Sequence, residues 1–167
     1  MSKIDKLRKF FKLFSIDGYL IPKNDEYFNE YVSESKDRLK FISNFSGSAG
    51  FAVILKNKNY LFVDGRYTIQ AKKQSGKKFV IHEIPYVWPK NILKKKNRKL
   101  NIGFDPKLFT NMTLLKYFED SCNLTPINKN LFNFKKDKIK KENLIYKIDN
   151  NVIGESSESK IKRVVKF

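Results

Sequence analysis

Along this chain, the spacing of apolar residues changes between one typical of helices and one typical of strands. In residues 1–14, apolar side chains recur every three or four positions with lysines between them, which predicts an amphipathic helix. A short apolar run at residues 19–21 ends at a proline and is typical of a strand. The apolar runs 51–55 and 60–63 are separated by four polar residues, and together they predict a β-hairpin.

Further alternation of helix and strand is expected up to about residue 128. The patterns predict helices at residues 37–42, 66–74, 87–96 and 113–121, and strands at residues 79–84, 100–104 and 124–127. Residues 25–35 are acidic and aromatic, and we expect them to form a loop and a short helix. The last strand contains Pro126, which is typical of a sheet edge. This order of elements predicts an α/β fold class.

The character of the chain changes after residue 128. We expect one domain at residues 1–133, followed by a charged linker at residues 134–154. Residues 155–167 then form an amphipathic segment with a serine cap, which we interpret as the first turns of a truncated second domain. A chain of 167 residues is long enough to bury a core of its own.

Composition changes this picture only in part. The formal net charge is +18, which allows a basic nucleic-acid-binding α/β module as an alternative function. The excess comes mainly from lysines spread along the chain, and arginine, the better reader of phosphates and bases, is scarce. This spread favours a lysine-rich proteome over a nucleic-acid ligand, so we expect no nucleic acid as partner.

The single cysteine, Cys122, excludes an internal disulfide and fits a reducing compartment. No apolar run approaches the length of a membrane span, and the N-terminal residues lack the pattern of a secretory signal. We therefore expect a cytoplasmic protein with no membrane attachment.

Catalytic chemistry has few candidates in this chain. His82 is the only histidine and has no second histidine four residues on, so a zinc site or a serine–histidine system has little to build on. We interpret His82 and Cys122 as structural or packing residues. The glycines near Ser46 and Ser48 match neither the phosphate-loop nor the dinucleotide-binding pattern. We expect no catalytic and no metal-binding residues here.

Three aspartates each follow a predicted strand: Asp25, Asp64 and Asp105. Such acids can build a two-metal nuclease site, and they are also ordinary turn formers and helix caps. Arg66 follows one of these strand ends in a chain that prefers lysine. It is expected either to pair locally with an aspartate or to recognise a carboxylate or carbonyl group across an interface.

Residues 37–67 and their flanks together resemble the N-terminal creatinase-like domain of aminopeptidase P, the Xaa-Pro aminopeptidases of peptidase family M24. The resemblance covers roughly residues 4–167. Its central motifs are Asp37 and Arg38; Phe41, Ile42, Ser43 and Phe45; Gly47, Ser48, Ala49 and Gly50; Asp64, Gly65, Arg66 and Tyr67; Gln70 and Ala71. Flanking motifs are residues 16–22, Asp25 with Glu30 and Tyr31, residues 102–106, and residues 154–156 with Lys160 and Ile161.

This resemblance implies a mixed β-sheet flanked by helices, in a ribonuclease-H-like arrangement. It implies that peptidase chemistry belongs to a C-terminal domain with two divalent metals, usually manganese, which is absent from this chain, so the chain alone is expected to be inactive and to hold no cofactor. The domain would shape substrate access and contribute to a homodimer. Its partners would be the domains that follow it in the parent protein and a peptide substrate with proline at its second position.

The resemblance also assigns residues. Arg66, Tyr67 and Asp64 are expected to face the substrate or a partner subunit. The structural signature consists of Asp37, Arg38, Gly47, Ser48, Gly50 and Gly65.

Overall fold

The computed structural model describes residues 1–95, 97–132 and 147–166. It divides into two compact units, residues Met1–Lys136 and Asp137–Phe167, and each is described by itself. Among the described residues, no helix has both the length and the apolar character that a membrane crossing needs. Most of the predicted linker lies outside the described residues, so the proposed domain boundaries stay a prediction.

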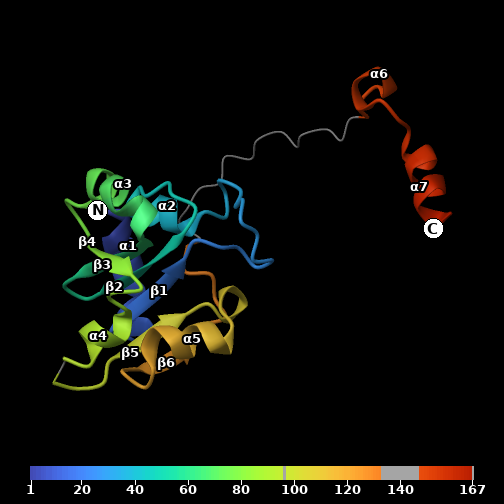
Figure 1. The fold of residues 1–167 in the computed structure, drawn as a ribbon. Coiled ribbons are helices and arrows are strands. Elements are labelled where there is room, and N and C mark those ends of the chain that lie inside the picture. The colour runs from blue at the N-terminus through green and yellow to red at the C-terminus, as the bar shows by residue number, and fades with distance from the viewer. Residues whose placement is uncertain (96, 133–146, 167) are drawn as a thin grey trace. The chain divides into compact units, whose positions relative to one another are not determined.

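The first unit is built on a six-stranded sheet with the order β4-β3-β2-β1-β5-β6 (Figure 1). Its strands are β1 (Gly18–Pro22), β2 (Gly50–Leu55), β3 (Asn59–Asp64), β4 (Val80–Ile84), β5 (Asn101–Phe104) and β6 (Asn123–Pro126). Strand β2 is antiparallel to both of its neighbours, and all other pairs are parallel. Five strands therefore run in one direction and β2 runs in the other.

The predicted hairpin is confirmed as β2 and β3, which pair from Gly50↔Val63 to Ile54↔Asn59. Glycine is required at its start, because Gly50 has a φ of 156° and an added Cβ would lie 2.8 Å from the carbonyl oxygen of Phe62. The edge position predicted for residues 124–127 is also confirmed, since β6 forms one edge of the sheet.

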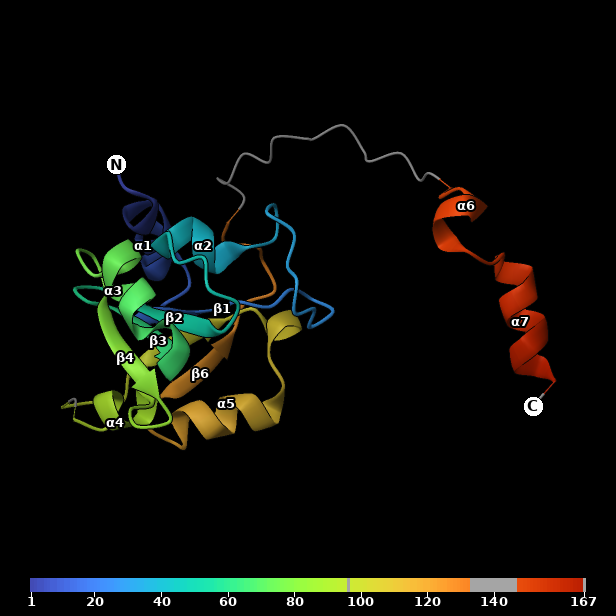
Figure 2. The ribbon, with the colours of Figure 1, turned by 45° about the horizontal axis from the view of Figure 1, so that its top comes forward.

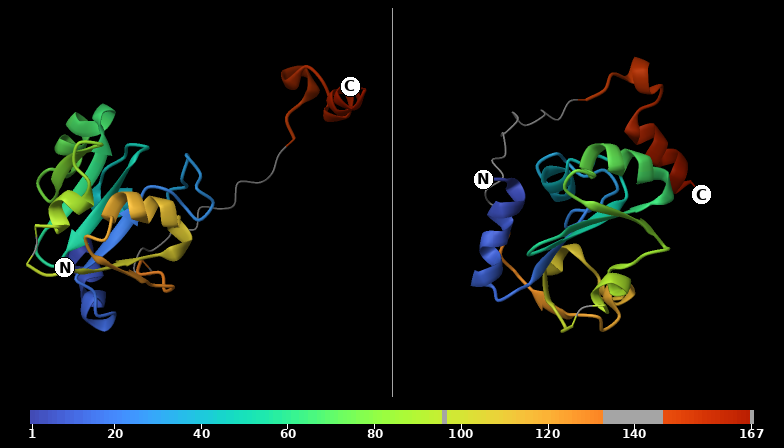
Figure 3. Two further views of the ribbon diagram at one scale, coloured as in Figure 1. Left: turned by 60° about the horizontal axis from the view of Figure 1, so that its bottom comes forward. Right: turned by 90° about the vertical axis from the view of Figure 1, so that its left-hand side faces the viewer.

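Helices cover both faces of the sheet, with a core on each side. Helices α1 (Lys3–Leu13), α2 (Arg38–Ser43) and α3 (Thr68–Ser75) pack on one face, while α4 (Pro89–Leu93) and α5 (Asn111–Phe118) pack on the other (Figure 2). The views in Figure 3 show the sheet between these two layers. Strand side chains alternate between the cores: Leu61 and Val63 face the first, and Tyr60 and Phe62 face the second. The predicted mixed sheet flanked by helices is confirmed.

Several boundaries differ from the predictions. The helix expected at residues 66–74 begins with a 3₁₀ turn, η1 (Gly65–Tyr67), and continues as α3. The helix expected at residues 87–96 is only α4, which begins at Pro89 and buries little besides that residue and Leu93. The short helix expected within residues 25–35 is absent, because backbone N–H groups there bond to the side chain of Asp25 instead of continuing a helical turn.

The second unit contains α6 (Asn150–Ile153), within the predicted linker, and α7 (Ser157–Val165). The predicted serine cap is Ser156, whose hydroxyl accepts a hydrogen bond from the backbone N–H of Ser159. One side of α7 carries exposed Ile161, Val164 and Val165.

Candidate functional site

The candidate site lies at the end of the sheet where the C-terminal ends of β1, β3 and β5 all lie. These parallel strands lead directly into the segments that contain Asp25, Asp64 and Asp105. Strands β3 and β5 are separated by β2 and β1, so at about 4.8 Å per strand their ends are roughly 14 Å apart. Two catalytic metals lie about 4 Å apart, so this spacing does not fit a two-metal nuclease.

Asp25 holds the loop that follows β1. Its carboxylate is buried and accepts hydrogen bonds from the backbone N–H groups of Tyr27 (3.0 Å) and Asn29 (3.1 Å) and from the side-chain amide of Asn29 (3.0 Å). The Asn29 amide is the main cause of a lowered pKa for Asp25, with the backbone donors adding to it. The neighbouring Asn24 amide donates to the carbonyl oxygen of Leu108 at 3.0 Å, which ties this loop to the segment after β5.

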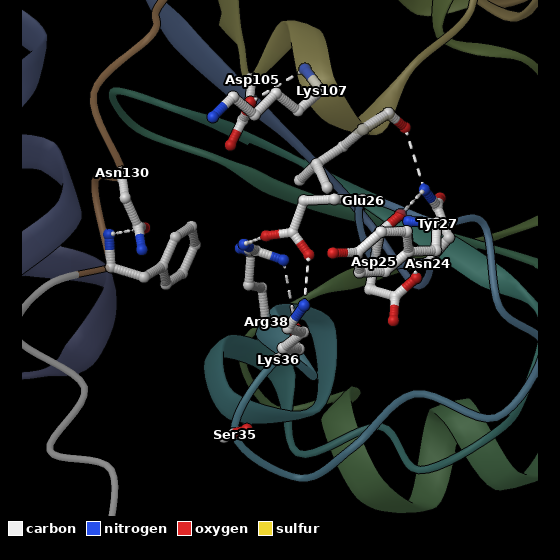
Figure 4. A network of polar contacts seen from close by, with 12 residues as sticks. Asn24, Asp25, Glu26, Tyr27, Ser35, Lys36, Arg38, Asp105, Lys107 and Asn130 are labelled. Carbon is white, nitrogen blue, oxygen red and sulfur yellow. Dashed lines mark hydrogen bonds and ion pairs between the residues drawn. The ribbon is translucent and has the colours of Figure 1, made fainter.

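Glu26 connects the same loop to α2 (Figure 4). Its carboxylate accepts one hydrogen bond from the Arg38 guanidinium at 2.7 Å and one from the Lys36 ammonium at 3.0 Å. Burial alone would raise the pKa of Glu26, but the bonds from Arg38 and Lys36 outweigh it and lower that pKa to about 2. Arg38 is 7% exposed, so Glu26 provides the carboxylate that a buried guanidinium needs.

Asp37 has two roles at the start of α2. One carboxylate oxygen caps the helix by accepting from the backbone N–H of Lys40 at 2.9 Å. The other accepts from the Lys23 ammonium at 2.6 Å, in a pair whose side chains are both largely buried. Asp37 and Arg38, predicted as structural signature residues, thus lie where α2 is joined to the loop between β1 and α2.

The turn before β2 packs against η1. Ser48 and Tyr67 share a hydrogen bond between their hydroxyl groups at 2.8 Å, and the Tyr67 ring meets the edge of the Phe45 ring with centroids 5.7 Å apart. An added Cβ at Gly47 would lie 2.3 Å from Phe45 and 2.9 Å from Tyr67. Glycine at position 47 therefore allows Phe45 and Tyr67 to pack together.

A second contact fixes the same turn to α3. The hydroxyl oxygen of Ser46 accepts from the side-chain amides of Gln70 and Gln74, each at 2.9 Å, and the Ser46 N–H donates to the Gln74 side chain at 3.0 Å. The hairpin entrance and the start of α3 thus form one connected surface.

Arg66 pairs with Asp64 within this surface. Its Nη2 donates to Asp64 at 2.7 Å and its Nε at 3.1 Å, while the Arg66 backbone N–H donates to the same carboxylate at 3.0 Å. These hydrogen bonds are the first cause of a lowered pKa for Asp64 and of a raised pKa for Arg66. The local-pair interpretation therefore matches the geometry. The Arg66 side chain is 73% exposed and its guanidinium lies 5.4 Å from the Tyr67 ring centroid, so the planar group stays accessible from outside.

Gly65 lies between these two partners. An added Cβ there would lie 2.9 Å from a carboxylate oxygen of Glu83, which is the end of a flexible side chain. Of the predicted signature glycines, Gly65 is thus the one whose neighbour could move most easily.

Sequence reasoning missed Glu26, Lys36 and Lys23 at this edge. Glu26 lies 12 residues from Arg38, Lys23 lies 14 residues from Asp37, and Lys36 lies 10 residues from Glu26. The sequence carries no signal for these contacts, because the burial of Arg38, which requires an acidic partner from another segment, is seen only in the fold.

His82 and Cys122 lie away from this edge. The His82 ring packs on Tyr60 and Phe62, with centroids 5.7 and 5.4 Å away, and burial lowers the pKa of the imidazole. Burial raises the pKa of the Cys122 thiol to about 12, so the thiol stays protonated and is a poor nucleophile. Both surroundings agree with packing roles.

Metal binding requires several donor side chains that converge on one point. In residues 1–95, 97–132 and 147–166, no three His, Cys, Asp or Glu side chains are placed to hold a metal ion. The described residues therefore do not fit a dinuclear metal centre.

Comparison with known proteins identifies a domain family and several longer relatives of this chain. Residues 3–131 match the model of the creatinase/prolidase N-terminal domain. The probable Xaa-Pro aminopeptidase P of Coprinopsis cinerea is 32% identical over 95% of this chain and 27% of its own length. Xaa-Pro aminopeptidase 1 of Dictyostelium discoideum is 31% identical over 97% of the chain and 29% of its own length. The chain thus spans less than a third of these curated relatives.

Solved structures agree with these sequence matches. An X-prolyl aminopeptidase from Caenorhabditis elegans, described as a cytosolic enzyme with a di-nuclear active site, covers 97% of this chain with a TM-score of 0.72 and 26% identity, over 30% of its own length. The N-terminal domain of a putative metallopeptidase from Corynebacterium diphtheriae shares the fold, with a TM-score of 0.54 and 17% identity over 74% of this chain and 94% of that chain. These relatives are named as peptidases, and the nucleic-acid-binding alternative gains no support from them. The chain belongs to the creatinase/prolidase N-terminal domain family.

Proposed function

We propose that this chain is the non-catalytic N-terminal domain of a longer Xaa-Pro aminopeptidase. The observation that carries the proposal is the extent of similarity. Relatives named as Xaa-Pro aminopeptidases match 95% and 97% of this chain but only 27% and 29% of their own length. A parent of this kind releases the N-terminal residue of a peptide in which proline is second.

The catalytic metals of such a parent would be held by residues outside this chain. The described residues present no converging set of donors, whereas the C. elegans relative is described as having a di-nuclear active site. We propose two divalent ions, with manganese as the expected metal, in a following domain of the same polypeptide. The domain described here would supply no ligand to them.

A peptide-release assay tests this proposal. The chain of residues 1–167 and the longer polypeptide encoded by its gene are each incubated with a Xaa-Pro-containing peptide and Mn²⁺. We expect release of the N-terminal residue only by the longer polypeptide. Turnover by residues 1–167 above the rate of a heat-denatured sample would contradict the non-catalytic role, and inactivity of the longer polypeptide would contradict the assigned reaction.

The edge that carries Arg66 is proposed to shape substrate access and to contribute to a homodimer. Its support is the combination of a fixed backbone and an accessible cation, since Asp64 orients a guanidinium that remains largely exposed. The adjacent loop also exposes aromatic side chains, with Tyr27 76% and Tyr31 89% exposed. Exposed aromatic residues and arginine are frequent at the centres of protein interfaces.

The variant Arg66→Lys in the longer enzyme tests whether Arg66 acts in substrate access or dimerisation, or only stabilises its own turn. Lysine keeps the charge but cannot form the bidentate pair with Asp64. We expect a raised KM for the peptide or a weaker dimer in sedimentation, with an unchanged melting temperature; Lys72→Arg, at an exposed position of α3, is the matched control. A lower melting temperature with unchanged KM and dimer affinity would leave Arg66 only its local structural role.

We propose a cytosolic location for the parent. The C. elegans relative is described as cytosolic, and the lone cysteine is buried and unpaired with any second thiol. Fractionation of cells that express the tagged full-length polypeptide tests this, and recovery in a membrane or secreted fraction would contradict it.

A further inference from the structure

A basic pocket lies at the other end of the strands, opposite to the candidate site. It has a volume of about 660 Å³ and forms where α1 ends, β1 and β5 begin and β2 ends. Four cationic side chains line it, from three separate segments of the chain: Arg8 and Lys12 on α1, Lys56 after β2 and Arg98 before β5. We call this group the basic pocket.

The one carboxylate in the lining of the pocket, Asp17, already has cationic partners that balance its negative charge. It is 7% exposed and accepts from two nitrogens of the Arg98 guanidinium, at 2.7 and 2.9 Å, and from the Lys56 ammonium at 3.0 Å. The backbone N–H of Asn101 donates to it at 3.0 Å. The Arg98 bonds are the first cause of a strongly lowered pKa for Asp17, so this carboxylate is ionised and fixes both cations.

Arg8 is fixed by uncharged acceptors. Its Nε and Nη2 donate to the carbonyl oxygen of Leu55 at 2.9 and 2.7 Å, and Nη2 also donates to the Asn59 side chain at 2.8 Å. The nearest carboxylate, Asp5, is 3.9 Å away and takes its hydrogen bonds from Ser2. The positive charge of Arg8 is therefore held in place with little compensation.

Lys12 adds a fourth positive charge. Within the part of the chain that the structure describes, its ammonium group has no hydrogen-bond or ion-pair partner. The carbonyl groups at the end of α1 accept from the backbone N–H groups of Phe14, Ser15 and Ile16. Lys12 is thus a donor that faces the pocket without an acceptor of its own.

Four cations around one carboxylate leave a formal charge of +3 in the lining of the pocket. Two of the five arginines of this lysine-rich chain line it, so general lysine enrichment does not explain its composition. A small, multiply charged anion matches such a cluster better than a single carboxylate, because it can accept charge-assisted hydrogen bonds from several donors at once. We propose that the basic pocket binds a phosphate group, either as inorganic phosphate or as part of a small phosphorylated molecule.

Calorimetric titration of residues 1–167 tests the proposal. Inorganic phosphate, pyrophosphate and glycerol 3-phosphate are titrated separately at low ionic strength, where charge interactions are least screened. We expect saturable one-to-one binding. Tighter binding of glycerol 3-phosphate than of phosphate would identify a phosphorylated molecule as the ligand, and the reverse order would identify the free ion.

Two double variants distinguish phosphate binding in the basic pocket from nonspecific attraction by the net positive charge of the protein. Lys12→Gln with Lys56→Gln removes two donors from the basic pocket, and Lys72→Gln with Lys73→Gln removes the same charge from two exposed positions of α3. We expect the first pair to weaken binding by about tenfold or more, as the loss of charge-assisted hydrogen bonds predicts, and the second by less than about twofold. Melting curves confirm that both variants are folded.

Amide chemical shifts measured during the same titration report the location. We expect the largest changes at Ile16, Lys56 and Asn101, whose backbones surround the pocket. The proposal is overturned by an absence of saturable binding at millimolar phosphate, by equal losses in the two double variants, or by shifts that map elsewhere. Tighter binding of an acidic peptide than of any phosphate probe at these amides would also overturn it, in favour of a protein partner.

Discussion

Replacing Glu26 by glutamine tests whether the loop after β1 is held by charge. Glu26 accepts hydrogen bonds from Arg38 and Lys36, and its pKa falls from an ordinary value of 4.5 to about 2. At about 1.4 kcal/mol per pKa unit, this change corresponds to at most about 3.5 kcal/mol of stability. The Glu26 side chain is 29% exposed, so solvent screening reduces the expected loss to about 1.5–2 kcal/mol at pH 7.

The sign of the pH dependence follows from the direction of the pKa change. The carboxylate is favoured in the folded state, so its contribution is present above about pH 4.5 and is lost as the pH falls towards 2. The difference in unfolding free energy between the natural chain and Glu26→Gln should therefore shrink to less than half between pH 7 and pH 3. In the variant, Arg38 remains buried without a carboxylate, which adds to the loss at neutral pH.

Urea unfolding at pH 7, 5 and 3, followed by circular dichroism, measures this difference. Glu30→Gln is the matched control, because it makes the same chemical change at an exposed position of the same loop. It should alter stability by less than about 0.5 kcal/mol, as surface substitutions usually do. A loss below that size for Glu26→Gln at pH 7, or an equal loss at pH 7 and pH 3, would refute the reasoning.

Three further outcomes are expected. Gly50→Ala should destabilise the domain by about 1–3 kcal/mol in urea unfolding, because its backbone has a φ of 156° and the new Cβ would meet the carbonyl oxygen of Phe62 at 2.8 Å; a neutral effect would contradict this. Tyr67→Phe removes only the 2.8 Å hydrogen bond to Ser48 on an exposed surface, so the unfolding free energy should fall by about 1 kcal/mol or less. Cys122 should resist alkylation by iodoacetamide at pH 8 in the folded protein and react in urea, since burial raises its pKa to about 12; equal rates in both states would argue against a buried thiol.

Local patterns predicted the hairpin but not which core each of its side chains fills. Strand side chains alternate between faces, so the succession Tyr60, Leu61, Phe62 and Val63 reads in the sequence as one apolar run but fills two cores in the fold. Helices flanking the sheet were implied by the family resemblance and not by this apolar run. Elements whose residues meet their partners within a few positions were therefore predictable.

The loop between β1 and α2 could not be predicted in the same way. Lys23 binds Asp37 and Glu26 binds Arg38, and these pairs join residues 14 and 12 positions apart without any regular period between them. Their pairing depends on the path that the loop takes across the sheet edge, which neither propensity nor periodicity determines. The expected short helix in this loop was wrong for the same reason, since Asp25 offers the backbone a competing set of hydrogen bonds.

The distribution of carboxylates distinguishes the two ends of the sheet more clearly than net charge does. At the end where β1, β3 and β5 finish, the cations have acids of their own: Arg66 has Asp64, and Arg38 shares Glu26 with Lys36. At the opposite end, one carboxylate, Asp17, lies among four cations in the lining of the pocket, and Asp5 approaches Arg8 only to 3.9 Å. A uniform excess of lysine would raise the charge of both ends alike, so the difference must arise from where the fold brings acids and bases together. The first end is therefore a largely self-compensated surface, whereas the second retains an excess of oriented donors that suits an anion.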